Sequence, residues 1–112
     1  MRKIYKENQL IELSKYSREV IECITEAISI LNENYGVERD IDNNLGGYIL
    51  VAENIVDIEI IKQDKLQGLV PEYTDVIKCS EGVNWTSSIF LLSSDYAIVV
   101  ITTEELSKFL LE

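Results

Sequence analysis

The chain contains no histidine, one proline and one tryptophan, and it has half as many basic as acidic residues. The absence of histidine removes the residue most often used as a general base and as a metal ligand. Neither a Ser-His-Asp triad nor a Cys-His pair can be built from this chain. We therefore expect a protein that is not an enzyme and has no catalytic residues.

Cysteine is also scarce, and both cysteines, Cys23 and Cys79, stand among apolar residues. Two cysteines with no histidine do not make a zinc site. No apolar segment typical of a signal peptide follows the basic start of the chain. No apolar run approaches the ~20 residues that cross a membrane as a helix. We expect a reduced, cytoplasmic setting in which both thiols are small core residues rather than a disulfide.

Basic residues are few and unevenly placed. The chain has 20 acidic and 10 basic residues, a formal net charge of −10. The first 18 positions hold five bases and two acids, a charge of +3, and the other 18 acids and five bases give −13. This charge opposes binding to nucleic acid or acidic membranes and favours a partner with a basic surface. We expect Arg2, Lys3 and Lys6 to contact the acidic remainder, a second chain or a ligand.

The length of 112 residues predicts a single domain, residues 1–112, with a core large enough to fold without disulfides or metals. Residues 8–35 carry apolar side chains at spacings of three, four and seven, which predicts one long amphipathic helix ending before Gly36. The apolar stripe breaks at Ser17, which favours packing on a sheet over a coiled coil.

Short apolar segments separated by polar turns predict strands in the rest of the chain. The two apolar runs nearest the C-terminus are uninterrupted, which indicates central strands covered on both faces. The expected strands are residues 48–52, 75–79, 85–92 and 96–101.

Residues 53–66 fit two structures. Their alternating apolar side chains suit a strand, whereas Asn54 followed by Asp57 resembles a helix capping box. We favour a short helix over residues 54–63, although its β-branched residues weaken helix propensity.

The expected fold class is α+β, with the long N-terminal helix packed on a roughly four-stranded, mainly antiparallel sheet. A short C-terminal helix should begin after Thr102 or Thr103. The sheet needs cover on both faces. If residues 53–66 were a strand, a second copy of the chain would have to complete that cover, so a homodimer is one alternative.

The segment from Asp42 to Glu53 resembles a calcium-binding EF-hand loop in part. It offers Asp at position 1, Asn at 3, Gly at 6, an apolar residue at 8 and Glu at 12, but Gly46 and Leu50 supply no side-chain oxygen where ligands are needed. The sequence favours a turn into a buried strand, with Gly46 and Gly47 allowing unusual backbone angles. We expect no metal and no cofactor.

Candidate binding residues come from the segment richest in acids, residues 33–59, and from aromatic residues beside the strands. Arg39 either holds this segment by pairing with a neighbouring acid or anchors a carboxylate of a partner. Tyrosine and tryptophan dominate interface hot spots, and packing at the edge of the core is the alternative. The candidate partner-binding residues are Glu38, Arg39, Asp40, Asp42, Glu53, Tyr73 and Trp85.

The favoured function is a small, acidic, non-catalytic binding or regulatory protein. It would neutralise or modulate a partner with a basic surface, as immunity and inhibitor proteins do. The alternative is a dimeric small-ligand-binding or regulatory domain with a pocket between sheet and helix. The same net charge would also keep a small protein soluble without any partner. Neither nucleic acid nor a membrane is expected as a partner.

Overall fold

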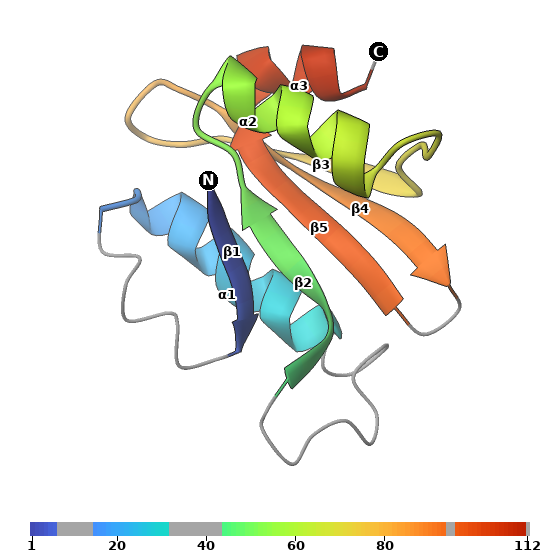
Figure 1. Ribbon diagram of the computed structural model, residues 1–112. Helices are drawn as coiled ribbons and strands as arrows, with labels where there is room; N and C mark the ends of the chain where they lie inside the picture. The colour runs from blue at the N-terminus through green and yellow to red at the C-terminus, as the bar shows by residue number, and fades with distance from the viewer. Residues whose placement is uncertain (7–14, 32–43, 94–95, 112) are drawn as a thin grey trace.

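The computed structural model describes residues 1–6, 15–31, 44–93 and 96–111. These residues form one mixed sheet with the strand order β1-β2-β5-β4-β3 and helices on both faces (Figure 1). The strands are β1 (Arg2–Lys6), β2 (Asn44–Val51), β3 (Tyr73–Ile77), β4 (Trp85–Ser93) and β5 (Tyr96–Thr103). The helices are α1 (Arg18–Ile30), α2 (Ile55–Ile60), its π-helical continuation η3 (Ile61–Lys65), and α3 (Glu104–Leu110).

The α+β class is confirmed, and the sheet differs from the expected one in two ways. It has a fifth strand, β1, which pairs antiparallel with β2. Its central pair, β2 and β5, is parallel, whereas β3–β4 and β4–β5 are antiparallel. A parallel pair requires a long crossover, and here the chain from α2 through β4 provides it. The four expected strands are present with ends shifted by a few residues.

The sheet separates two apolar cores, because alternate side chains of its central strands point to opposite faces. One face is covered by α1, which lies behind β1 and β2 in Figure 1, and the other by α2, η3 and α3. Fully buried residues on the α1 face include Ile4, Val20, Ile24, Leu31, Ile49, Val51 and Ile101. Buried residues on the other face include Leu50, Ile58, Ile61, Phe90, Ile98 and Val100.

The helix α1 begins at Arg18 because Ser17 is its N-cap. The Ser17 side chain accepts a hydrogen bond from the Val20 N–H at 3.4 Å, and its backbone is extended. The break in the apolar stripe at Ser17 therefore marks the start of the helix. The expectation of a helix over residues 8–35 is wrong for residues 15–17, which lie before the first helical residue, Arg18, while residues 8–14 and 32–35 lie outside the described part.

Capping also decides the structure of the segment after β2. The Asn54 side chain accepts the Asp57 N–H at 2.9 Å, and the buried Asp57 carboxylate accepts the Glu53 N–H at 2.9 Å. Both bonds favour a helix start over a strand. The short helix expected over residues 54–63 is therefore present as α2 and η3, and it helps to cover the second face of the sheet.

The parallel pairing of β2 with β5 starts at Gly47, which lies opposite Ala97. Gly47 has φ = +147°, and a Cβ atom there would lie 1.7 Å from the Ala97 carbonyl oxygen. The strand β2 already begins at Asn44, so the segment that partly resembles an EF-hand is a strand from Asn44 to Val51. This agrees with the expected entry into a buried strand; Asp42 lies outside the described residues.

Candidate functional site

The structure places three of the seven candidate residues. Glu53 follows β2, Trp85 begins β4, and Tyr73 begins β3. Glu53 and Trp85 are connected through Tyr16, whereas Tyr73 lies at the far end of β3, because β3 and β4 are antiparallel and Ile77 pairs with Trp85. The other four, Glu38, Arg39, Asp40 and Asp42, lie outside the described residues.

Glu53 lies in a small polar cluster just before α1. Its carboxylate accepts hydrogen bonds from the Tyr16 hydroxyl and, at 3.0 Å, from Lys15 Nζ. The Tyr16 ring packs edge-on against Trp85, with 5.9 Å between ring centroids. Trp85 is half-buried against the core under α1, which agrees with the core-edge role considered for it.

The ionisable groups of this cluster are not tuned for proton transfer near neutral pH. Burial, and then the hydrogen bond to Glu53, raise the pKa of Tyr16. The bonds from Tyr16 and then Lys15 lower the pKa of Glu53. A general acid or base works best with a pKa near the operating pH, and both shifts lead away from it. The cluster therefore has the chemistry of a structural contact between α1 and the end of β2.

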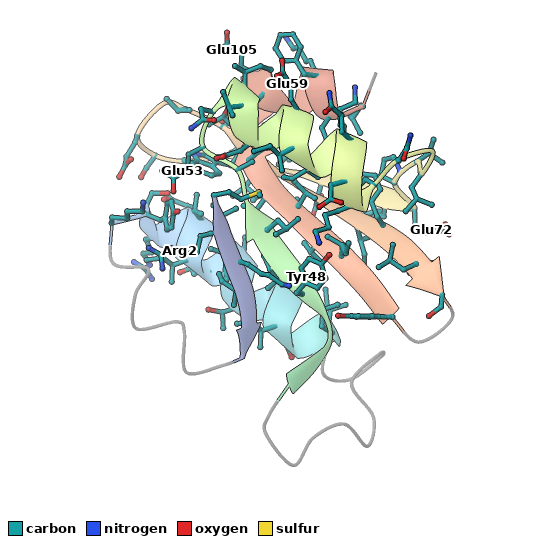
Figure 2. All side chains as sticks on the ribbon, viewed as in Figure 1. Arg2, Tyr48, Glu53, Glu59, Glu72 and Glu105 are labelled. Carbon is teal, nitrogen blue, oxygen red and sulfur yellow. The ribbon has the colours of Figure 1, made fainter. Side chains whose placement is uncertain are left out.

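The basic N-terminal end of the chain faces acids in the same region, as Arg2 and Glu53 show in Figure 2. A cavity of about 480 Å³ lies between the start of β1 and the start of α2. The terminal ammonium lies 3.4 Å from the Asp57 carboxylate, and Lys3 Nζ lies 4.3 Å from the centre of the Tyr48 ring. The terminal ammonium thus lies on an acid and Lys3 on an aromatic ring, and contact of Arg2, Lys3 and Lys6 with the acidic remainder stays a prediction.

Replacing Glu53 with glutamine should make the stability of the protein less dependent on acid pH. A carboxylate whose pKa is lower in the folded state than in the unfolded state stabilises the fold at a pH above its ordinary pKa of 4.5. This contribution is lost as the pH falls through the pKa of the folded state. The stability difference between wild type and Glu53→Gln should be largest near neutral pH and shrink as the pH falls below the ordinary carboxyl pKa of 4.5, measured by urea unfolding. The exposed Glu81 supplies the control, Glu81→Gln, and an equal response of both variants would contradict the prediction.

A second region combines an apolar hollow with exposed carboxylates. It is a groove between α1 and the strands β3 and β4, with a cavity of about 160 Å³. Apolar side chains from α1 and β4 line its floor, and Tyr73, 61% exposed, stands beside it. Glu26 and Asp75, both exposed, also line it, one from the helix and one from the strand. We call this the α1–β3 groove.

Cys23 lies in the floor of the α1–β3 groove. Burial first, and then the charges of Glu26 and Asp75, raise the pKa of its thiol to about 11, although a hydrogen bond with Ser87 acts in the opposite direction. A thiol with this pKa is protonated at neutral pH and is a poor nucleophile. Cys23 and Cys79 are both free, in agreement with the expectation that they form no disulfide.

The sequence predicted only Tyr73 in this groove. Glu26 looked like one of several acids on the polar side of a helix, and Asp75 looked like the ordinary start of a strand. Their proximity depends on α1 lying beside β3, which no spacing along the chain reveals. An exposed aromatic residue beside an expected strand was the available signal.

No family model, no curated protein and no solved structure matches this chain. Across the described ranges no three His, Cys, Asp or Glu side chains are grouped so as to hold a metal ion. No helix within those ranges is long and apolar enough to span a membrane.

Proposed function

We propose that the protein is a non-catalytic binding module that acts in the reducing cytoplasm and neutralises or modulates a protein partner with a basic surface. The partner docks at the α1–β3 groove, where Glu26 and Asp75 provide negative charge and the floor provides apolar contact. The net charge of −10 accelerates encounter with a basic partner, and the groove gives the contact its specificity.

One observation carries this proposal: an apolar hollow bordered by two exposed carboxylates and an exposed tyrosine. An apolar pocket holds an anchor side chain, charged groups around it select its neighbours, and tyrosine is enriched at interface hot spots. The Lys15–Tyr16–Glu53 cluster supports the non-catalytic part of the proposal, because its pKa shifts lead away from neutrality.

The small-ligand alternative has one cavity in its favour. About 300 Å³ lies between η3, the loop after it and α3, above Phe90 and Leu110. Ligand pockets need a few polar groups that fix orientation. Lys62 donates to the Phe109 carbonyl oxygen at 2.7 Å, so the cation that lines this cavity already has a protein partner. This cavity supports the alternative less well than the groove supports a protein partner.

Charge reversal at the groove should weaken the binding of basic peptides. Selection from a displayed random peptide library should enrich sequences with lysine or arginine near an apolar residue. The double variant Glu26→Lys, Asp75→Lys should bind the selected peptides about tenfold or more weakly, because like charges then face each other. Binding to the wild type should also weaken as salt is raised, since exposed charge pairs are screened.

The matched control is Glu59→Lys, Glu105→Lys. It makes the same change in net charge on α2 and α3, which cover the other face of the sheet and lie at the top of Figure 2. This variant should retain most of the binding. Equal loss in both double variants would show only a response to net charge, and failure to enrich any basic peptide would contradict the proposed function.

A further inference from the structure

We infer that the partner segment binds as an additional β-strand along β3, an inference that rests on the proposed function. The strand β3 is the last in the sheet order, and among the described residues no strand pairs with its outer side. An edge strand presents a row of N–H and C=O groups to which another chain can pair. Recognition by strand addition combines these backbone bonds with pockets for alternate side chains.

The two edges of the sheet differ in a way that favours β3. The other edge, β1, carries three basic residues, Arg2, Lys3 and Lys6, among its five positions. Lysine on an edge strand discourages pairing with another chain. In contrast, β3 carries one charge, that of Asp75, with Tyr73 61% and Val76 49% exposed. The open, weakly charged edge is therefore the one that adjoins the α1–β3 groove.

The register of β3 defines the pattern that an added strand must have. Tyr73, Asp75 and Ile77 pair with Ile89, Ser87 and Trp85, on the sheet face that packs against α1. An added antiparallel strand would place alternate side chains on this same face. A basic residue would then lie opposite Asp75, with apolar residues two positions away on either side, beside Tyr73 and beside Ile77.

The hollow of the groove matches one such apolar side chain. Its volume is about 160 Å³. An apolar cavity of about 150 Å³ in another protein binds benzene, so this hollow accommodates one aliphatic or aromatic side chain. Glu26 and Asp75 both line this hollow together with Cys23, so a base beside this apolar residue would meet both carboxylates. The recognised segment is therefore apolar-x-basic-x-apolar in an extended conformation.

Charge favours a basic partner over a second copy of the chain at this edge. Symmetric antiparallel pairing of two copies about the middle of β3 would place the two Asp75 side chains directly opposite each other, with the two Glu26 side chains beside their respective grooves. Like charges directly opposite in a sheet are destabilising. Each copy also carries a net charge of −10. A partner strand with a basic residue opposite Asp75 avoids this repulsion between carboxylates.

The test uses the peptide KVTRTLK, in which V, R and L share one face of a strand. Its control, KTVRLTK, has the same composition but moves both apolar residues to the other face. Titration followed by fluorescence anisotropy should show about fivefold or weaker binding of the control. Asp75→Lys should weaken binding of KVTRTLK about tenfold, and Glu105→Lys should not. On binding, those amides of residues 73–77 that point away from β4 should gain protection from hydrogen exchange.

Backbone methylation separates strand addition from other modes of binding. Two versions of KVTRTLK are methylated on the amides of alternate positions, so that one of them loses every N–H that faces β3. That version should lose binding. If both versions bind as well as the parent and the β3 amides gain no protection, strand addition is wrong, whereas the proposed function stands as long as Glu26→Lys, Asp75→Lys still weakens binding.

Two further outcomes overturn the inference. Protection, in the protein alone, of those amides of residues 73–77 that point away from β4, together with a concentration-dependent rise in mass, would show that a second copy occupies the edge. If neither KVTRTLK nor the library yields a peptide whose binding depends on Glu26 and Asp75, the proposed function fails together with the inference.

Discussion

Replacing Gly47 with alanine is expected to lower the free energy of unfolding by about 4 kcal/mol or more. Single substitutions have effects of this size only when they severely disturb the backbone or the core. The added Cβ would lie 1.7 Å from the Ala97 carbonyl oxygen, where β2 and β5 approach each other, and φ = +147° is a conformation that other residues rarely adopt. Relieving the clash would separate the central parallel pair of the sheet. Urea unfolding monitored by the fluorescence of Trp85, the single tryptophan, measures the effect.

Gly68 provides the matched control for this prediction. It also has a positive φ, +78°, but an added Cβ would meet no atom within 4 Å. Gly68→Ala should therefore cost only the backbone strain, about 1 kcal/mol. A similar loss in both variants would mean that φ alone, and not the approach of β2 to Ala97, makes glycine necessary at position 47.

Replacing Phe90 with alanine should cost about 3–5 kcal/mol, because it leaves a cavity in the second core. Phe90 belongs to β4 and is 1% exposed, and its side chain lies beneath α3 and the end of η3. The cost includes both the lost burial of the ring and the empty space that its neighbours cannot fill. Thermal and urea unfolding of the purified variant should both report the loss.

Phe109 is the natural comparison, since it is the same residue type on α3 and is 43% exposed. Phe109→Ala should cost about 1 kcal/mol or less, because most of that ring area is already in contact with water. If Phe109→Ala were as destabilising as Phe90→Ala, the side of α3 that packs on the sheet would have been assigned wrongly.

The helical and strand segments were predictable where a local signal existed. The Asn54–Asp57 cap, the threonine cap at Thr103 and the uninterrupted run in β5 all act within a few residues of the chain. The start of α1 was predicted wrongly because the role of Ser17 was misinterpreted. Ser17 was interpreted as an interruption of an apolar stripe, whereas its hydrogen bond to the Val20 N–H makes it the first residue outside the helix.

The strand β1 was missed because its pattern is set by its position in the sheet. Its segment offers Ile4 among basic residues, and Ile4 is fully buried only because β2 and α1 meet there. The parallel pairing of β2 with β5 likewise depends on where the chain from α2 to β4 leads, not on the residues of the two strands. Local patterns contain neither kind of information.

In the candidate site, too, some residues could be predicted from the sequence and others could not. Tyr73 was predicted from its type and its place beside a strand, and it lies at the α1–β3 groove. Trp85 was predicted on the same grounds and is half-buried against Tyr16. Glu26 and Asp75 were not predicted, because 49 positions separate them and only the packing of α1 beside β3 brings them to one groove.

The sequence by itself determined the α+β class, the excess of acid, the absence of histidine chemistry and most of the strands. These follow from composition and from periodicities that act within one element. The tertiary structure alone decided the fifth strand, the parallel central pair and the carboxylates that flank the groove. Each of these depends on contacts between residues far apart in the chain, and their geometry exists only once the sheet and both of its helical layers have assembled.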